Sequence, residues 1–246
     1  HENIKVQEVS SSDNNDIFVT IEKNAQTETI TGSHLLVSTG RRANVQGLDL
    51  EKACVKYSAK GIEVDARLRS SNKHIYAIGD VAGSFQFTHI ANYHAGIVLR
   101  NILFRLPAKV DYGAVPWVTY TEPEMAHVGL TIDSEKTQSG IQITEWPYAD
   151  NDRAQAEHEI TGKIKVITDK NAKILGVTIV GSKAGELILP WVMAIREKKT
   201  LRSFTDTIVP YPTLSELSKR VAGEFYTPKL FSKKVRWLVK WLLKLG

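Results

Sequence analysis

The chain has 246 residues, of which 42% are hydrophobic and 24% charged, a composition typical of one large or two medium globular domains. Its one cysteine, Cys54, excludes a disulfide within the chain and a cysteine-based metal cluster, and a reducing compartment fits this usage. No run of about 18 uncharged apolar residues occurs, so we expect no segment that spans a bilayer.

The net charge of +5 is concentrated at the C-terminal end of the chain. Six basic residues and no acidic ones follow position 226, and removing them leaves a net charge of −1 for everything before. Because the basic residues form no second cluster elsewhere, we expect no nucleic-acid partner.

The first part of the chain alternates short apolar runs with polar turns. Residues 1–38 predict a hairpin or meander, with strands at 17–21, near Ile30 and at 35–37. Residues 41–72 are loop-rich, and the apolar run at 74–78 predicts a buried strand. The near-helical spacing of apolar residues then predicts a helix over 88–106, which Pro107 ends.

From about residue 112 the pattern predicts an antiparallel sheet covered by helices, an α+β domain. We expect strands at 117–120, 126–129, 163–168 and 174–180, and helices at 133–139, 184–198 and 213–225. A basic amphipathic segment follows at 229–245.

The sharpest short motif is YAIGD at residues 76–80. Gly79 allows a ligand to approach the backbone without a Cβ in the way, and the Asp80 carboxylate is a strong acceptor for a ribityl or ribose hydroxyl. The alternative is a strand that is followed by an ordinary Asp turn.

Several segments in a fixed order surround this motif. They are LLVSTGRRAN at 35–44, GKIKV at 162–166, ILGV at 174–177, VGSKAGELI at 180–188, DTI at 206–208 and YPTLSE at 211–216. Together they closely resemble the dihydrolipoamide dehydrogenase and mercuric reductase family of pyridine nucleotide–disulfide oxidoreductases. The resemblance covers residues 17–225.

The resemblance implies four segments. Residues 1–35 would end a domain that binds NAD(P)H, residues 36–111 would belong to a domain that binds FAD, residues 112–225 would form a homodimer interface, and residues 226–246 would be a tail.

The same resemblance assigns flavin contacts. Asp80 would bind the ribityl chain, with Gly79 beside it, while Thr39 and Gly40 would line the flavin pocket. His89 would lie near the flavin edge, although it and His94 are alternatively satisfied or solvated histidines. A cytoplasmic flavoprotein of cell redox homeostasis is implied.

Two features of the family do not occur in the chain: a G-x-G-x-x-G phosphate-binding turn and a C-x-x-x-x-C redox pair. Both precede the matched region in the family. We therefore expect a portion of a longer enzyme, which alone neither holds FAD tightly nor passes electrons to a disulfide.

Two residues are the candidate catalytic groups. Where the family has a histidine that handles the thiol proton, the chain has Tyr211, and Glu216 keeps the family's glutamate position. A phenol is a poor base near neutral pH, so Tyr211 does not identify the electron acceptor. A disulfide, a metal ion and a quinone are all candidates. The alternatives are that Tyr211 packs at the dimer seam, and that Glu216 and Thr213 form a capping box.

The tail predicts an amphipathic helix. Lys229, Lys233, Arg236, Lys240 and Lys244 share one face, and Trp237 and Trp241 flank an apolar face. Such a helix is typical of contact with the inner surface of a membrane, and the alternative is packing on the interface domain. A non-catalytic dimerisation module with a membrane tail is the rival function. We expect no metal site, since no cluster has metal-ligand spacing.

Overall fold

The computed structural model describes residues 1–131 and 140–244. The chain divides into two compact units, His1–Val110 and Asp111–Gly246. Each unit has its own cluster of buried apolar side chains.

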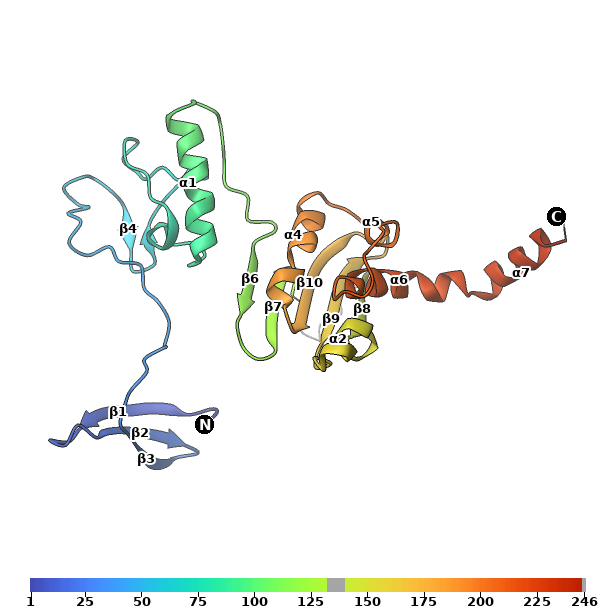
Figure 1. The fold of residues 1–246 in the computed structure, drawn as a ribbon. Coiled ribbons are helices and arrows are strands. Elements are labelled where there is room, and N and C mark those ends of the chain that lie inside the picture. Colours follow the sequence, from blue (N-terminus) through green and yellow to red (C-terminus); the bar gives the residue numbers. More distant parts are fainter. Residues whose placement is uncertain (132–139, 245–246) are drawn as a thin grey trace. The chain divides into compact units, whose positions relative to one another are not determined.

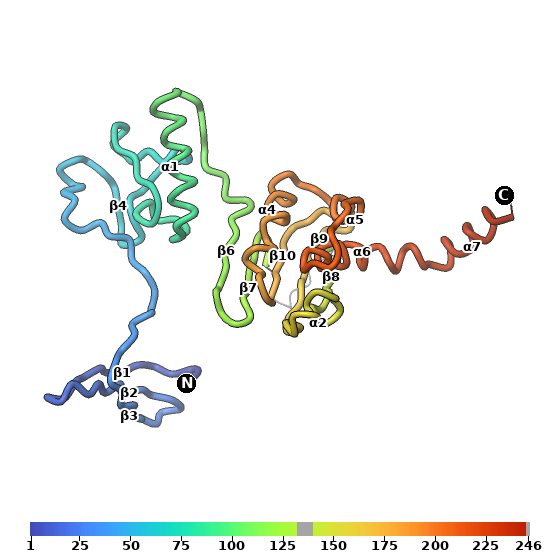
Figure 2. Tube along the Cα trace, viewed as in Figure 1, coloured from blue at the N-terminus to red at the C-terminus, as the bar shows by residue number. Residues whose placement is uncertain are grey.

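The first unit begins with a three-stranded antiparallel meander (Figures 1 and 2). Its strands are β1 (Lys5–Ser11), β2 (Ile17–Lys23) and β3 (Gln26–Gly32), in that order. The strands predicted at 17–21 and near Ile30 are confirmed, whereas the strand at 5–11 was not among the predicted ones. Asn24 and Ala25 join β2 to β3 with φ of 51° and 62°, which makes a two-residue turn whose twist matches that of the strands.

The rest of this unit holds the YAIGD motif. It contains β4 (Tyr57–Ser58), β5 (Gly61–Ile62), the 3₁₀ helix η1 (Gly79–Ala82) and α1 (Thr88–Ile102). The core below them is small and consists of Leu50, Val55, Ile62, Ala77 and Ala82.

Two strands that the sequence predicts in this unit are absent from the described residues. Residues 35–37 are extended but unpaired, and the side chain of Leu36 is 87% exposed. Of residues 74–78, only Tyr76 pairs, in a single bridge with Arg69. An apolar run becomes a strand only where a neighbouring strand accepts its backbone hydrogen bonds, and here no described strand does.

Helix α1 ends at Ile102, four residues before the predicted end. The side-chain amide of Asn101 donates to the carbonyls of Ile97 and Ala108, at 2.9 and 2.8 Å. This pair of bonds ties the returning chain to the last turn, so the helix stops before Pro107.

The second unit is built on a five-stranded antiparallel sheet. In the order β6-β7-β10-β9-β8, its strands are β6 (Pro116–Thr119), β7 (Glu124–Gly129), β10 (Ile174–Gly181), β9 (Lys163–Asp169) and β8 (Ile141–Pro147). With the helices packed on it, this sheet confirms the predicted α+β class.

Helices cover one face of the sheet (Figure 1). The helices α3 (Ala184–Leu187) and α4 (Leu189–Arg196) pack on β7 and β10, while α6 (Glu216–Leu230) packs on β8 and β9. The buried indole of Trp191 on α4 donates to the hydroxyl of Ser218 on α6, at 3.1 Å. It also stacks on Phe204 of α5 (Arg202–Thr205), with ring centroids 3.9 Å apart.

Two of the helices predicted for this unit have other bounds in the structure, and a third is not described. The single helix expected at 184–198 is two helices, because the chain turns at Ile188 and restarts with Pro190 in the first turn of α4, where no N–H is required. The helix expected at 213–225 begins at Glu216 and continues to Leu230. The helix expected at 133–139 lies outside the described residues.

The remaining elements of this unit are η2 (Tyr148–Asp150), α2 (Asp152–Glu157) and, at the C-terminal end, α7 (Lys233–Leu242). Helix α7 continues beyond α6 and projects away from the sheet (Figure 1). Ser232 separates the two helices: its backbone is extended, and its hydroxyl accepts a 3.4 Å hydrogen bond from the amide of Val235.

Candidate functional site

The YAIGD motif ends in the 3₁₀ helix η1 rather than in a strand followed by a turn. Gly79 has a φ of 68°, and a Cβ added to it would lie 3.0 Å from the Cβ of Ala91 on α1. Only glycine takes this conformation at low cost so close to a helix. The backbone therefore lies against α1 at the first residue of η1.

His94 fixes this contact. The amide of Gly79 donates to Nδ1 of His94 at 3.1 Å, and the imidazole is fully buried. Burial lowers the pKa of His94, because the charged ring would lose its hydration. His94 is thus a satisfied core histidine that holds η1 on α1.

The Asp80 side chain has a different environment. It is half-buried in the first turn of η1, and within the described part of the chain its carboxylate makes neither a hydrogen bond nor an ion pair. A carboxylate with free lone pairs on a rigid turn can accept hydrogen bonds from the hydroxyls of a ligand.

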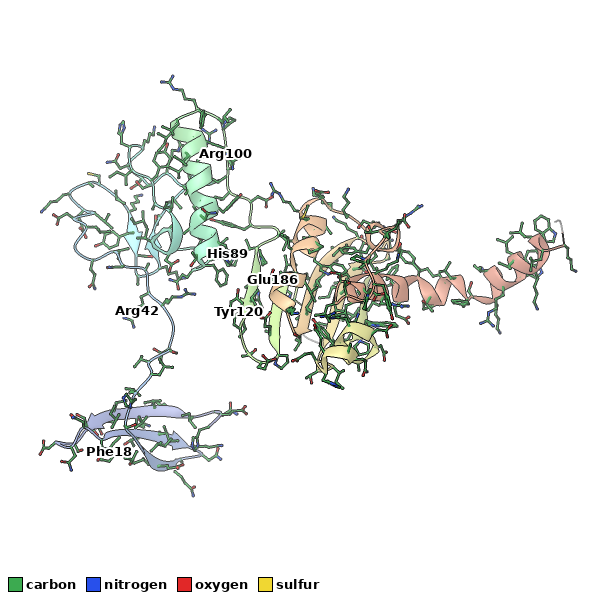
Figure 3. The ribbon with its side chains drawn as sticks, in the orientation of Figure 1. Phe18, Arg42, His89, Arg100, Tyr120 and Glu186 are labelled. Carbon is green, nitrogen blue, oxygen red and sulfur yellow. The ribbon has the colours of Figure 1, made fainter. Side chains whose placement is uncertain are left out.

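The other predicted flavin contacts are exposed. His89 lies near the start of α1 (Figure 3). Its ring stacks on that of Phe87, with ring centroids 5.0 Å apart. Thr39 and Gly40 lie in an exposed loop, where Gly40 has a φ of 119° and open space around its Cα. No hydrogen bond between described residues joins this loop to η1.

Tyr211 lies outside the helices, as expected, and its side chain is 69% exposed. Its hydroxyl donates to Oδ2 of Asp152, the first residue of α2, at 3.0 Å. This bond raises the pKa of the phenol, because the neighbouring carboxylate holds the proton in place. Tyr211 therefore stays protonated near neutral pH and cannot act there as a base.

Sequence reasoning missed Asp152, which is 59 residues from Tyr211. Neither a motif nor the resemblance pointed to it. A weak signal was present in the residue before it, since asparagine followed by aspartate is a typical helix start.

Glu216, the second candidate catalytic residue, is the first residue of α6 and is partly exposed. The predicted capping box is wrong: the N-cap is Ser215, which makes no side-chain cap hydrogen bond. The Thr213 hydroxyl donates instead to the carbonyl of Pro210, at 2.7 Å. Glu216 lies close enough to Tyr211 for its charge to raise the phenol pKa further, although less than Asp152 does.

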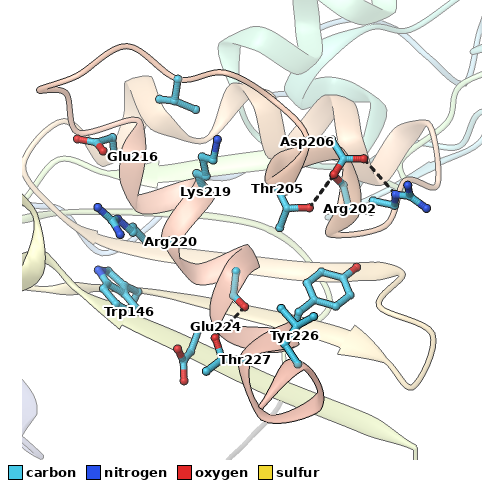
Figure 4. A pocket seen from close by; sticks show the side chains of 13 residues that line it. Trp146, Arg202, Thr205, Asp206, Glu216, Lys219, Arg220, Glu224, Tyr226 and Thr227 are labelled. Carbon is cyan, nitrogen blue, oxygen red and sulfur yellow. Dashed lines mark hydrogen bonds and ion pairs between the residues drawn. The ribbon is translucent and has the colours of Figure 1, made fainter. Parts of the chain in front are cut away.

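A groove of about 850 Å³ runs along the exposed face of α6 (Figure 4). Glu216 lies at one end and Leu230 at the other, with Trp146 from β8 and Arg202 from α5 along the sides. Arg202 pairs with Asp206 at 3.0 Å, and Tyr211 does not line the groove.

The tail helix α7 has no buried residue. Trp237 is 68% exposed and Trp241 49%, and Leu238, Val239 and Leu242 are also exposed. The predicted alternative, in which this apolar face packs on the chain's own interface domain, is therefore wrong for the described residues. None of the described helices is both long and apolar enough to span a bilayer.

Metal ligands do not gather in the described part of the chain, where no group of three His, Cys, Asp or Glu side chains is arranged to hold an ion. The candidate residues fall into two sets. Thr39, Gly40, Gly79, Asp80 and His89 belong to the first unit, and Tyr211 and Glu216 to the second.

Comparison with known families matches both units. Residues 1–95 match the sequence model described as pyridine nucleotide-disulphide oxidoreductase. Residues 115–222 match the one described as the dimerisation domain of the same group.

Curated relatives give the same result. A mercuric reductase of Staphylococcus aureus is 37% identical over 208 residues, which is 83% of this chain and 38% of that protein. A dihydrolipoyl dehydrogenase of Staphylococcus aureus is 35% identical over 211 residues, or 85% of this chain and 45% of that protein. The chain thus spans less than half the length of these relatives.

Solved structures show the same fold. The HOCl-induced flavoprotein disulfide reductase RclA from Escherichia coli matches with a TM-score of 0.79 and 25% identity, over 89% of this chain and 50% of that one. LpdA from Mycobacterium tuberculosis matches with a TM-score of 0.81 and 25% identity, over 91% of this chain and 48% of that one.

Proposed function

Because the chain belongs to the pyridine nucleotide–disulfide oxidoreductase family, we propose that it supplies flavin contacts and the homodimer interface of an enzyme in that family. The enzyme would use FAD and NAD(P)H, as in the lipoamide dehydrogenase and mercuric reductase branches. Residues 1–35 would end the NAD(P)H-binding domain, 36–111 would belong to the FAD-binding domain, and 112–225 would form the interface.

The unpaired carboxylate of Asp80 is the observation that carries this proposal. It lies on a turn that Gly79 and His94 fix, so its position does not depend on a flexible loop. A half-buried carboxylate without a partner in the described chain fits a ligand that brings hydroxyl groups, such as the ribityl chain of FAD. When bound, FAD would carry electrons from the nicotinamide to an acceptor.

The acceptor remains a choice among a disulfide, a metal ion and a quinone. The curated relatives include enzymes named for mercuric ion and for a lipoyl group. Tyr211 favours an acceptor that needs no histidine base, because its phenol stays protonated at neutral pH.

An Asp80→Asn variant tests the flavin contact. In the complete protein that contains this chain, we expect the FAD content of the variant after gel filtration to be several-fold or more below that of wild type. The reason is that one charge-assisted hydrogen bond is worth about 1.5–3 kcal/mol. Asp13→Asn, on an exposed turn, is the control. Equal flavin absorbance in all three proteins would sink the assignment of Asp80.

The wild-type complete protein can also be used to identify the electron acceptor. Oxidation of NADH and of NADPH is followed with lipoamide, a water-soluble benzoquinone and mercuric ion in turn. Activity with none of them, together with a stable dimer, would favour the rival function, a non-catalytic dimerisation module.

The tail adds a second proposal: residues 229–245 contact the surface of a membrane. The exposed apolar face of α7, its two exposed tryptophans and its basic residues support this. An amphipathic helix of this kind lies in the interface, with its apolar side among the acyl chains and its lysines near anionic headgroups. The protein would then be peripheral to the inner face of a membrane.

A further inference from the structure

Residues 148–152 of the second unit form a hydrogen-bonded segment with two buried side chains, and this segment holds Tyr211 in place. The ring of Tyr148 is fully buried, and its hydroxyl donates to the carbonyl of Ser182 at 3.0 Å. Asn151, 3% exposed, caps α2 by accepting from the amide of Ala154 at 3.0 Å.

Hydrogen bonds join this 148–152 segment to residues 211–213, which include Tyr211. The side-chain amide of Asn151 donates to the carbonyl of Thr213 at 3.1 Å. Asp152, the next residue, accepts from the Tyr211 hydroxyl at 3.0 Å. Two bonds from adjacent residues therefore fix the segment and the side chain separately, although both Tyr211 and Asp152 are exposed.

A phenol has one proton to donate and two lone pairs to accept with. While the proton of Tyr211 points at the Asp152 carboxylate, only the lone pairs remain for another group. The carboxylate also polarises the O–H bond, which makes the phenol oxygen a better acceptor.

We infer that Asp152 is a positioning residue, because it keeps the hydroxyl proton of Tyr211 in the hydrogen bond between them. Tyr211 then offers only its lone pairs to the bound electron acceptor, toward which it is a hydrogen-bond acceptor. This inference rests on the proposed function in one respect, the location of Tyr211 at the acceptor site. It narrows the electron acceptor to a molecule or ion that presents a hydrogen-bond donor or a positive charge to the phenol. A carbonyl oxygen, which can only accept, would have no bond from Tyr211.

The pair is tested on the chain itself by NMR with tyrosine labelled with ¹³C at Cζ, where Tyr211→Phe assigns the signal. We expect Asp152→Asn to shift the Tyr211 signal at neutral pH and to lower the pKa of the phenol toward about 10, the free value. Glu216→Gln is the matched control, because it removes a nearby charge but no hydrogen bond. The other tyrosine signals report that the fold is intact.

The outcomes separate the inference from the proposed function. If Asp152→Asn moves neither the signal nor the pKa of Tyr211 more than Glu216→Gln does, the inference is wrong. If only Asp152→Asn moves them while Asp80→Asn leaves the flavin content of the complete protein unchanged, the pair is real and the flavin assignment fails.

The reaction gives a second readout in the complete protein. Asp152→Asn should lower the neutral plateau of the kcat/KM profile about two- to tenfold, the effect of one hydrogen bond, because an amide no longer forces the phenol to donate its proton. Asp152→Glu should restore part of this loss. An unchanged plateau would contradict a role for the pair at the acceptor site.

Discussion

His127, in the middle of β7, is a buried histidine whose two ring nitrogens are both bonded. Nδ1 lies 2.9 Å from the hydroxyl of Thr178, and Nε2 lies 3.1 Å from the carbonyl of Gly129. Burial lowers its pKa below the usual value, and the charge of Lys165 lowers it further. The ring is therefore a neutral part of the sheet, between β10 and the indole of Trp117.

A lowered pKa ties the stability of the second unit to pH. The unfolded chain binds a proton on this ring near pH 6.5, while the folded chain binds it only at lower pH. The stabilisation is therefore complete above about pH 6.5 and is lost as pH falls toward the folded-state pKa. We expect wild type to lose more free energy of unfolding between about pH 7.5 and pH 5.5 than His127→Gln does.

Urea unfolding monitored by tryptophan fluorescence measures this difference, because all five tryptophans follow residue 111. Parallel losses in the two proteins would mean that His127 does not titrate differently in the folded state. His94 is present in both proteins, so its own burial cancels in the comparison.

Sequence reasoning led to some of the candidate residues at the level of single residues. The YAIGD motif pointed to Gly79 and Asp80, because a glycine before an anionic acceptor at the end of an apolar run is a local signal. Asp152 gave no such signal, since its bond to Tyr211 joins residues 59 apart and exists only once the sheet brings α2 beside the 211–213 segment. Contacts of this kind come from tertiary packing, which a single sequence does not show.

At the level of elements, two glycines have opposite roles. Gly181 ends β10, has a φ of 153°, and a Cβ on it would collide with the ring of Tyr148 beneath. Gly223 is in the middle of α6, and a Cβ there would meet nothing within 4 Å. The first glycine is required by packing, whereas the second only weakens its helix.

These positions form a matched pair of substitutions. We expect Gly181→Ala to lower the free energy of unfolding by about 2–4 kcal/mol, from overpacking and backbone strain. Gly223→Ala should raise it by about 0.5–1 kcal/mol, the helix preference for alanine over glycine. Thermal unfolding of both variants checks the signs, and a neutral Gly181→Ala would show that the Tyr148 ring can move aside.

The elements that the sequence predicted correctly are those with their partners nearby in the chain. The β9–β10 and β2–β3 hairpins follow from alternation and turn residues, whereas β1 was not named as a strand. The strands expected at 35–37 and 74–78 failed, because apolar character was read as a strand without a partner edge. The helix expected at 184–198 was interrupted where Pro190 restarts it.

At the level of the whole molecule, α7 presents an apolar face that no described part of the chain covers. Its apolar residues adjoin six lysines and arginines between positions 229 and 244. Each cation near an anionic bilayer contributes about 1 kcal/mol to binding. Binding should therefore depend on both lipid charge and the tryptophans.

Co-sedimentation with vesicles tests this expectation. We expect the chain to pellet with vesicles that contain phosphatidylserine, and to pellet much less with pure phosphatidylcholine vesicles. Removing residues 232–246, which leaves α6 whole, should abolish pelleting, and Trp237→Ala with Trp241→Ala should weaken it about tenfold or more, given the apolar area removed. Equal pelleting of the full and shortened chains would contradict a membrane role for the tail.

The unpaired run at residues 35–37 has a consequence for handling of the chain. Leu35, Leu36 and Val37 are 44%, 87% and 69% exposed, in an extended backbone whose hydrogen-bonding groups no described strand uses. Such a run pairs with any free strand edge that it meets, including the same run of a second copy. We therefore expect this run to promote aggregation of the isolated chain in concentrated solution.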